Sequence, residues 1–376
     1  QAPDLIILQP ASTLRQGQAE ERRYGMLTQD RGIMYGYLAG LLKNESFGKV
    51  LGYIENDHKG TVDEQCRLAL TEAPTFSEGK RAELLCGKFR ELGLADVHID
   101  DAGNATGLLK GAAGGGLLLV EAHLDTVFPA GTVKGVTNNG DRIEVPGICD
   151  NCRGLAAMLG IIRAIKASGI RLAHDVLFAA TTGEEGLGDL KGMKELFKPE
   201  KRGFYASISI DGCGGHFVFD GTGSRRYSVV FETTGGHSWM DFGSPSAVHS
   251  LGRAVAKITS FSVPEEPKTT FNVGTVGGGT SVNSIAQRAE MLVDMRSVSS
   301  EELRKLEASF KQAVFEACKE EMDKSRNKHE VRSSFRKVGD RPGGLQDGTN
   351  GMRLLAELSG DLLGMGPGRD RLRVAV

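Results

Sequence analysis

The chain has 376 residues, of which 40% are apolar and 25% charged, as in a folded globular protein large enough for two domains. Its formal net charge of −2 excludes the strongly basic surface of a nucleic-acid-binding protein, and no apolar run approaches the roughly 18 residues of a membrane-spanning helix. Six cysteines without the dense spacing of a disulfide framework indicate a reducing compartment. We therefore predict a cytoplasmic protein that binds neither nucleic acid nor membranes.

The first 55 residues have a mixed pattern and are left unassigned. Two helices are predicted after them, one over residues 62–71 and one that Ser77 caps, with Glu78 in its first turn, running to about residue 92. Alternating residues 97–100 and residues 105–110 flank a Gly-Asn turn, which predicts two antiparallel strands.

Apolar runs alternate with a helical pattern between residues 117 and 210. The stretch LLLVEAHLD at 117–125 opens with an apolar run and predicts a buried strand that ends at His123 and Asp125, and residues 175–181 and 207–210 are two more strands. A helix is predicted over residues 154–168, and Asn-Asn-Gly at 138–140 predicts a hairpin turn. This alternation predicts a doubly wound α/β sheet.

The pattern changes after about residue 221 to β-α-β-β-α-β, which is typical of a small ferredoxin-like α+β domain. The predicted strands are residues 227–233, 269–276, 289–296 and 331–338, and the predicted helices are 247–260 and 301–324. A helix at 352–363 and a strand at 372–376 follow. We predict a catalytic domain made of residues 56–218 and 339–376, interrupted by a lid at 219–338.

Acidic groups and a histidine follow four successive strands or loops of the first domain. They are His123 with Asp125, Asp150, the pair Glu184-Glu185, and Asp211. Because parallel strands bring their carboxyl ends to one edge, we expect these side chains to converge. Mixed nitrogen and oxygen ligands indicate Zn²⁺, with Co²⁺ or Mn²⁺ as alternatives.

The adjacent glutamates suit two tasks, because neighbouring side chains diverge. One can ligate a metal while the other acts as a general base. An isolated Glu-Glu is usually a solvated loop, but here the pair ends an apolar strand and leads into Gly186-Leu187-Gly188.

Several ordered motifs resemble the M20 family of zinc metallopeptidases, which holds small-peptide exopeptidases such as peptidase T, carboxypeptidases and N-acyl-amino-acid deacylases. In the first domain they are HLDTVFP at 123–129, PGICDNCRGLAA at 146–157, TGEEGLGDLKG at 182–192 and SIDG at 209–212. The resemblance continues through GGHSWMDFGSPSAVHSLGRA at 235–254, NVGTVGGGTSVNSI at 272–285 and AEMLVDMRS at 289–297, and covers roughly residues 62–376.

The resemblance implies a role for each matching residue. His123 and Asp211 would bind one metal and Glu185 a second, with Asp150 bridging both, Asp125 orienting His123, and Glu184 acting as the general base. In the lid, His237, Asn283 and Arg296 would bind substrate, with His237 reaching the partner subunit's site in a homodimer formed through the lids.

One departure concerns the last histidine ligand, which family members usually carry near the C-terminus. No histidine follows His329 in this chain. We therefore expect that the C-terminal part of the catalytic domain is truncated and that the second metal position, at Glu185, binds weakly.

The predicted function is peptidase T-like: an exopeptidase that hydrolyses small peptides with one or two zinc ions and Glu184 as the base. The alternatives are an N-acyl-amino-acid deacylase or carboxypeptidase of the same family, or a catalytically impaired fragment that lacks the last histidine ligand.

Overall fold

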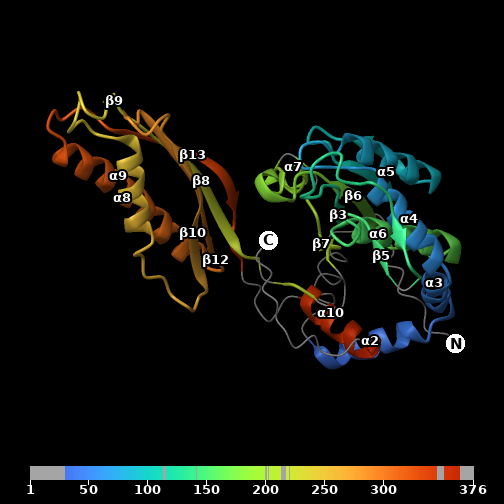
Figure 1. The fold of residues 1–376 in the computed structure, drawn as a ribbon. Helices are drawn as coiled ribbons and strands as arrows, with labels where there is room; N and C mark the ends of the chain where they lie inside the picture. Colours follow the sequence, from blue (N-terminus) through green and yellow to red (C-terminus); the bar gives the residue numbers. More distant parts are fainter. Residues whose placement is uncertain are drawn as a thin grey trace. The chain divides into compact units, whose positions relative to one another are not determined.

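The computed structural model describes residues 30–364, apart from 113–115, 141, 200, 202, 213–216, 220 and 345–350. Its contacts divide the chain into two units (Figure 1). Unit 1 comprises the described residues of Gln1–Phe217 and Gly348–Asp370, and unit 2 comprises those of Val218–Asp347. Each unit is described by itself.

Unit 1 is built on a five-stranded sheet. Its order is β1 (Ala95–Ile99), β2 (Ala105–Leu109), β6 (Asp175–Thr181), β3 (Leu117–His123) and β7 (Ala206–Ser209). Strand β3 runs parallel to its neighbours β6 and β7, whereas β2 is antiparallel to both β1 and β6. The predicted α/β class is confirmed, with parallel strands where the acidic motifs end and an antiparallel pair at the opposite edge.

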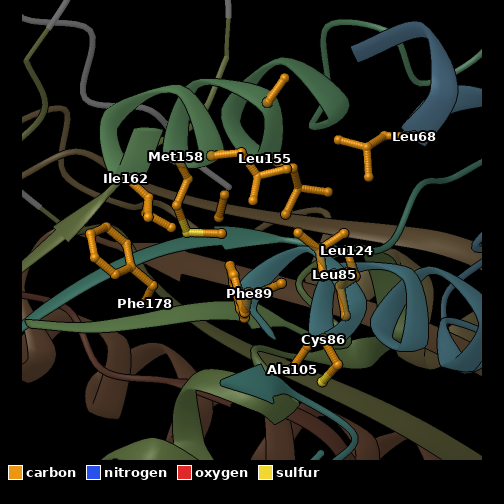
Figure 2. Close-up of a cluster of buried hydrophobic side chains, with 14 of the residues drawn as sticks. Leu68, Leu85, Cys86, Phe89, Ala105, Leu124, Leu155, Met158, Ile162 and Phe178 are labelled. Atoms are coloured by element: carbon orange, nitrogen blue, oxygen red, sulfur yellow. The ribbon is translucent and has the colours of Figure 1, made fainter. Parts of the chain in front are cut away.

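Helices cover both faces of this sheet. Helices α4 (His58–Leu70), α5 (Gly79–Glu91) and α6 (Cys152–Ser168) pack on the main core, which contains Val120 and Phe178. Figure 2 shows Leu155, Met158 and Ile162 of α6 near Phe178, together with Leu85 and Phe89 of α5. On the other face Leu196 of α7 (Lys191–Leu196) contacts Leu119 and Ala179. Successive residues of β3 and β6 point to opposite faces, and both faces are covered, which explains the apolar runs at residues 117–120 and 176–180.

The start of α5 differs from the prediction by one residue. The N-cap is Glu78 rather than Ser77, and its carboxylate accepts hydrogen bonds from two backbone amides, those of Phe76 and Gly183. Beyond the main sheet, β4 (Thr137–Asn138) and β5 (Ile143–Glu144) form the predicted hairpin, and a short 3₁₀ turn covers Gly186–Gly188.

Two helices occupy the N-terminal part that the sequence left unassigned, α2 (Arg31–Leu42) and α3 (Glu45–Asn56). Figure 1 shows α2 beside α10 (Gly351–Leu362), and Met34 and Leu38 of α2 pack on Leu358. A helix distant in sequence therefore covers α2. The strand predicted at 372–376 lies outside the described residues.

Unit 2 has the predicted β-α-β-β-α-β order. The elements are β8 (Gly223–Glu232), α8 (Ala247–Ile258), β10 (Thr269–Gly278), β12 (Arg288–Ser297), α9 (Ser300–Lys324) and β13 (Arg332–Arg341). The sheet is antiparallel in the order β10-β12-β8-β13, and a separate pair joins β9 (Gly236–His237) to β11 (Ser284–Ile285). Both helices pack on one face, over a core that includes Val229, Met291 and Phe310.

Among the helices that the structure describes, none is both long and apolar enough to cross a membrane.

Candidate metal centre

Strand β3 places a histidine at the carboxyl edge of the unit 1 sheet. The side chain of His123 is 3% exposed, and its Nε2 lies 2.9 Å from Oδ1 of Asp150 and 3.7 Å from Oδ1 of Asp211. Its Nδ1 lies 3.0 Å from the backbone oxygen of Asp125 and 3.5 Å from Oδ1 of that residue. One ring nitrogen thus faces two partly exposed carboxylates while the other is held by Asp125.

The two carboxylates that face His123 come from different loops, which Asn151 joins. Asp150 precedes α6, and Asp211 follows β7. The buried amide of Asn151 caps α6 by accepting from the Gly154 backbone N–H (3.0 Å) and donates to the Ile210 carbonyl (2.8 Å). A single side chain therefore fixes the spacing of the Asp150 and Asp211 loops.

The Glu184-Glu185 pair follows β6, and the backbone N–H groups of both glutamates are hydrogen-bonded to Asp125. The two carboxylate oxygens of Asp125, which is fully buried, accept from the backbone N–H groups of Glu184 (2.9 Å) and Glu185 (3.0 Å). The same carboxylate accepts a hydrogen bond from Oγ1 of Thr75 (2.9 Å). Asp125 thus contacts both the histidine and the loop of the two glutamates.

Three of these side chains form a group that fits a cation. His123, Asp150 and Glu185 each offer a ligand atom, and these atoms lie within 4.8 Å of one another. Asp211 adds a further oxygen near His123. One imidazole with several carboxylates is a donor set that suits Zn²⁺ and similar divalent ions, because gathering those negative charges without a cation is costly.

The protonation equilibria reflect this crowding. Burial and then repulsion from Asp150 raise the pKa of Glu185. Burial alone would lower the pKa of His123, but its contacts with Asp125, Asp150 and Asp211 outweigh burial and raise it. The hydrogen bond from His123 in turn holds the pKa of Asp211 below its ordinary value. In the metal-free protein a proton on His123 supplies part of the charge that a metal ion would bring.

We expect metal affinity to rise with pH, because a ligating histidine must be neutral and a ligating glutamate ionised. The raised pKa values of His123 and Glu185 mean that bound protons compete with the metal at higher pH than ordinary side chains would allow. The affinity should rise about tenfold per pH unit where metal binding displaces one proton, that of His123. At the lower pH where Glu185 is protonated as well, the affinity should rise more steeply, because metal binding then displaces two protons. Zinc affinities from chelator competition would show this slope, and a pH-independent affinity would contradict it.

Two of the predicted substrate residues lie together in unit 2. Ser284 pairs with His237, and the Ser238 N–H donates to the carbonyl of Asn283 (3.0 Å). Nδ1 of His237 accepts from the backbone N–H of Trp239 (3.2 Å), so neutral His237 carries its proton on Nε2. Oδ1 of Asn283 accepts from Ser281 (2.8 Å). The pair therefore presents N–H donors on an exposed edge.

Arg296 lies at the other end of the same unit. It is near the end of β12, eight positions after Arg288, which corresponds to roughly 27 Å along the strand. Its Nε donates to Oδ2 of Asp294 (2.7 Å), and Nε of Arg226 donates to the other oxygen of that carboxylate (3.1 Å). Within one copy of unit 2, Arg296 is therefore far from His237 and Asn283.

Several residues that support the site were not predicted from the sequence. One of them, Glu121, had a detectable signal, because two-residue periodicity places it on the same face as His123. It is buried, accepts from Oγ1 of Thr181 (2.9 Å), and burial raises its pKa. The others carried no local signal, since their partners are distant in sequence; they are Thr75, Glu78, Arg81, Asn104 and Asn151.

Two family models match the chain. The model described as peptidase family M28 matches residues 104–267, which include the edge of the unit 1 sheet with all the metal-centre residues. The model described as a peptidase dimerisation domain of the M20 type matches residues 222–322, which lie in unit 2.

Similar proteins include peptidases and a protein of unknown role. The chain is 29% identical to the uncharacterised protein YqjE of Bacillus subtilis (strain 168) over 277 residues, covering 69% of this chain and 72% of that protein. It is 26% identical to carboxypeptidase G2 of Pseudomonas sp. (strain RS-16) over 265 residues, covering 68% of this chain but only 60% of that enzyme.

A tripeptidase from Staphylococcus aureus has a similar fold. The two structures superpose with a TM-score of 0.67 and 24% identity, over 81% of each chain. At this identity the likeness concerns the fold.

Proposed function

The chain is an M20-like metallopeptidase, and on that premise we propose that it removes single residues from small peptides by metal-dependent hydrolysis. The supporting observation is the convergence of His123, Asp150 and Glu185 on one point, with Glu184 beside them on the same loop. Peptides remain the substrate class that we favour over N-acyl amino acids.

We propose that His123, Asp150, Glu185 and Asp211 hold one or two divalent ions, of which zinc suits the donor set best. Such an ion supplies Lewis-acid chemistry: it polarises the scissile carbonyl and lowers the pKa of water. Asp125 would keep the imidazole of His123 oriented, because its backbone oxygen lies 3.0 Å and its carboxylate 3.5 Å from Nδ1, and carbonyls and carboxylates commonly do this for ligating histidines.

Glu184 is the proposed general base. It follows Gly183 at the end of β6, and its backbone N–H is fixed by Asp125, so its side chain starts from a defined position. Its carboxylate would take a proton from the attacking water and deliver it to the departing amine. Glu184 would therefore make both proton transfers of the reaction.

The lid residues are proposed to bind substrate. Arg296 would pair with the free carboxylate of a peptide, since a guanidinium donates two parallel hydrogen bonds. Arg296 lies roughly 27 Å along β12 from Arg288, at the opposite end of the strand from the His237 edge, and this span is longer than a small peptide. We therefore propose that a homodimer forms through the lids and that His237 and Asn283 serve the partner subunit's site.

The peptide end that is recognised can be tested with a free tripeptide, its N-acetylated form and its C-terminal amide. We expect amidation to raise KM about 10- to 100-fold, because a charged hydrogen bond is worth about 1.5–3 kcal/mol. Arg296→Met should raise KM for the free peptide to a similar extent and have little further effect on the amide.

Arg288→Met is the matched control, since Arg288 lies on the same strand and pairs with Glu290. Faster hydrolysis of N-acetylated substrates would favour the deacylase alternative. Equal KM values for wild type and Arg296→Met would exclude Arg296 as the carboxylate ligand.

A cytoplasmic location is retained as part of the proposal, supported by the sparse cysteines.

A further inference from the structure

The loop that carries the two glutamates has all four of its first backbone N–H groups bound by side-chain oxygens. The acceptors come from three separate segments, and the four bonds are Thr182 to Oδ1 of Asn104 (2.9 Å), Gly183 to Oε1 of Glu78 (3.0 Å), Glu184 to Oδ1 of Asp125 (2.9 Å) and Glu185 to Oδ2 of Asp125 (3.0 Å). Loop backbone is usually fixed by other backbone groups or by water. Here side chains bind all four of these N–H groups, while carbonyls of the loop accept from backbone N–H groups.

Glu78 is the acceptor that joins this loop to the start of α5. Its side chain is buried, and the same Oε1 that accepts from Gly183 also accepts from the backbone N–H of Phe76 (3.0 Å). Phe76 has φ of 72°, an unusual conformation for a large residue, so this hydrogen bond helps to hold the turn. In that turn Thr75 donates to Asp125, so one short segment contacts two of the three acceptor residues, Glu78 and Asp125.

The loop has little freedom to move away from these acceptors. Gly183 has φ of 62°, and a Cβ at Gly188 would lie 2.5 Å from the Cα of Gly183. On the other side, Asn104 also donates to the carbonyl of Gly192 (3.0 Å), whose N–H donates to Thr182 (2.8 Å). Because Gly183 and Gly188 have no side chains, their backbones can approach this closely. This close packing places the loop N–H groups within hydrogen-bond distance of the side-chain acceptors.

We propose that Glu78 is a positioning residue of the metal centre. By holding the Gly183 N–H it fixes the point from which the side chains of Glu184 and Glu185 extend toward His123 and Asp150. A shift of about 1 Å in such groups can cost about 100-fold in rate, and loss of an outer contact commonly costs 10- to 100-fold in metal affinity or activity. The part of this inference that concerns turnover rests on the proposed function.

Two substitutions of Glu78 separate the effect of its side-chain length from the effect of its charge. Glu78→Asp keeps the charge and a favourable N-cap residue but retracts the carboxylate by one methylene, about 1.5 Å. Glu78→Gln loses the charge but keeps an oxygen at the same reach. We expect Glu78→Asp to lower kcat and zinc affinity about 10- to 100-fold with little change in KM, and Glu78→Gln to retain most of both.

Hydrogen exchange of the 182–185 amides gives a readout that requires neither metal nor substrate. In Glu78→Asp it should accelerate by about tenfold or more, while amides in the core of β6 remain unchanged. Glu72→Ala is the control, because Glu72 also accepts from two backbone amides, Gly131 (2.8 Å) and Val133 (2.8 Å), in a loop without site residues. That variant should match the wild type at the 182–185 amides.

The proposal is overturned if Glu78→Asp leaves loop exchange and zinc affinity at wild-type values. It is also overturned if Glu78→Gln is impaired while Glu78→Asp is not, because charge rather than reach would then matter. Failure of the proposed function looks different: wild-type protein would bind zinc without hydrolysing peptides. Loop exchange and zinc affinity would still decide the role of Glu78.

Discussion

Glu184→Gln is expected to lower kcat for a small peptide by about 10²- to 10⁴-fold while leaving bound metal unchanged. The amide is nearly isosteric with the carboxylate but cannot accept the proton of water, so the loss falls on the chemical step. The backbone N–H of Glu184 that Asp125 holds is unaffected by the substitution, so the loop should keep its position. Steady-state kinetics together with elemental analysis of the purified variant measure both quantities.

Glu83→Gln provides the control for this variant, because Glu83 is an exposed residue of α5 in the same unit. It should retain wild-type kinetics. Three outcomes are informative. Full activity in Glu184→Gln would remove the residue from catalysis, and loss of metal would assign it to ligation instead. A wild-type protein without any peptidase activity would favour the catalytically impaired alternative.

Asp150→Ala is expected to abolish stable metal binding. Asp150 contributes the carboxylate closest to Nε2 of His123 and is also a member of the three-residue group with Glu185. Its removal takes away one of the proposed metal ligands. Loss of a residue that only supports a ligand can lower metal affinity by roughly 100-fold, and we expect the loss of Asp150 to lower it further. Elemental analysis after gel filtration gives the number of metal ions per chain for the variant and for the wild type.

Asp101→Ala is a suitable control, since Asp101 is an exposed aspartate in the turn before β2. It should bind as much metal as the wild type. We expect about one tightly bound ion in the wild type, because His123 is the single histidine among these acidic groups in the described residues. A ratio near two would mean that a further group completes the second position, and unchanged metal content in Asp150→Ala would exclude this centre.

Local patterns in the sequence were sufficient for the parts of the fold that depend on periodicity. The apolar run before His123 predicted β3, and the change from one periodicity to another predicted the ferredoxin-like order of unit 2. The strand ends also predicted that His123, Asp150 and Glu185 would meet, because parallel strands share an edge.

Helix α2 shows why other parts could not be predicted. It contains three glycines, which disfavour a helix, and its apolar residues do not form one clear stripe. The structure shows that α2 packs on α10, more than 300 residues later in the chain. Its stability therefore depends on a partner that local propensity does not reveal.

The sequence by itself determined the order along the chain of the strands of both main sheets and the chemistry available at the sheet edge, since both follow from residue types at fixed spacings. Only the tertiary structure decided how that chemistry is held in place. Glu78 reaches Gly183 across 105 positions, and Asn104 reaches Thr182 across 78. Such hydrogen bonds depend on distances between segments that meet only after folding, and no local periodicity encodes them.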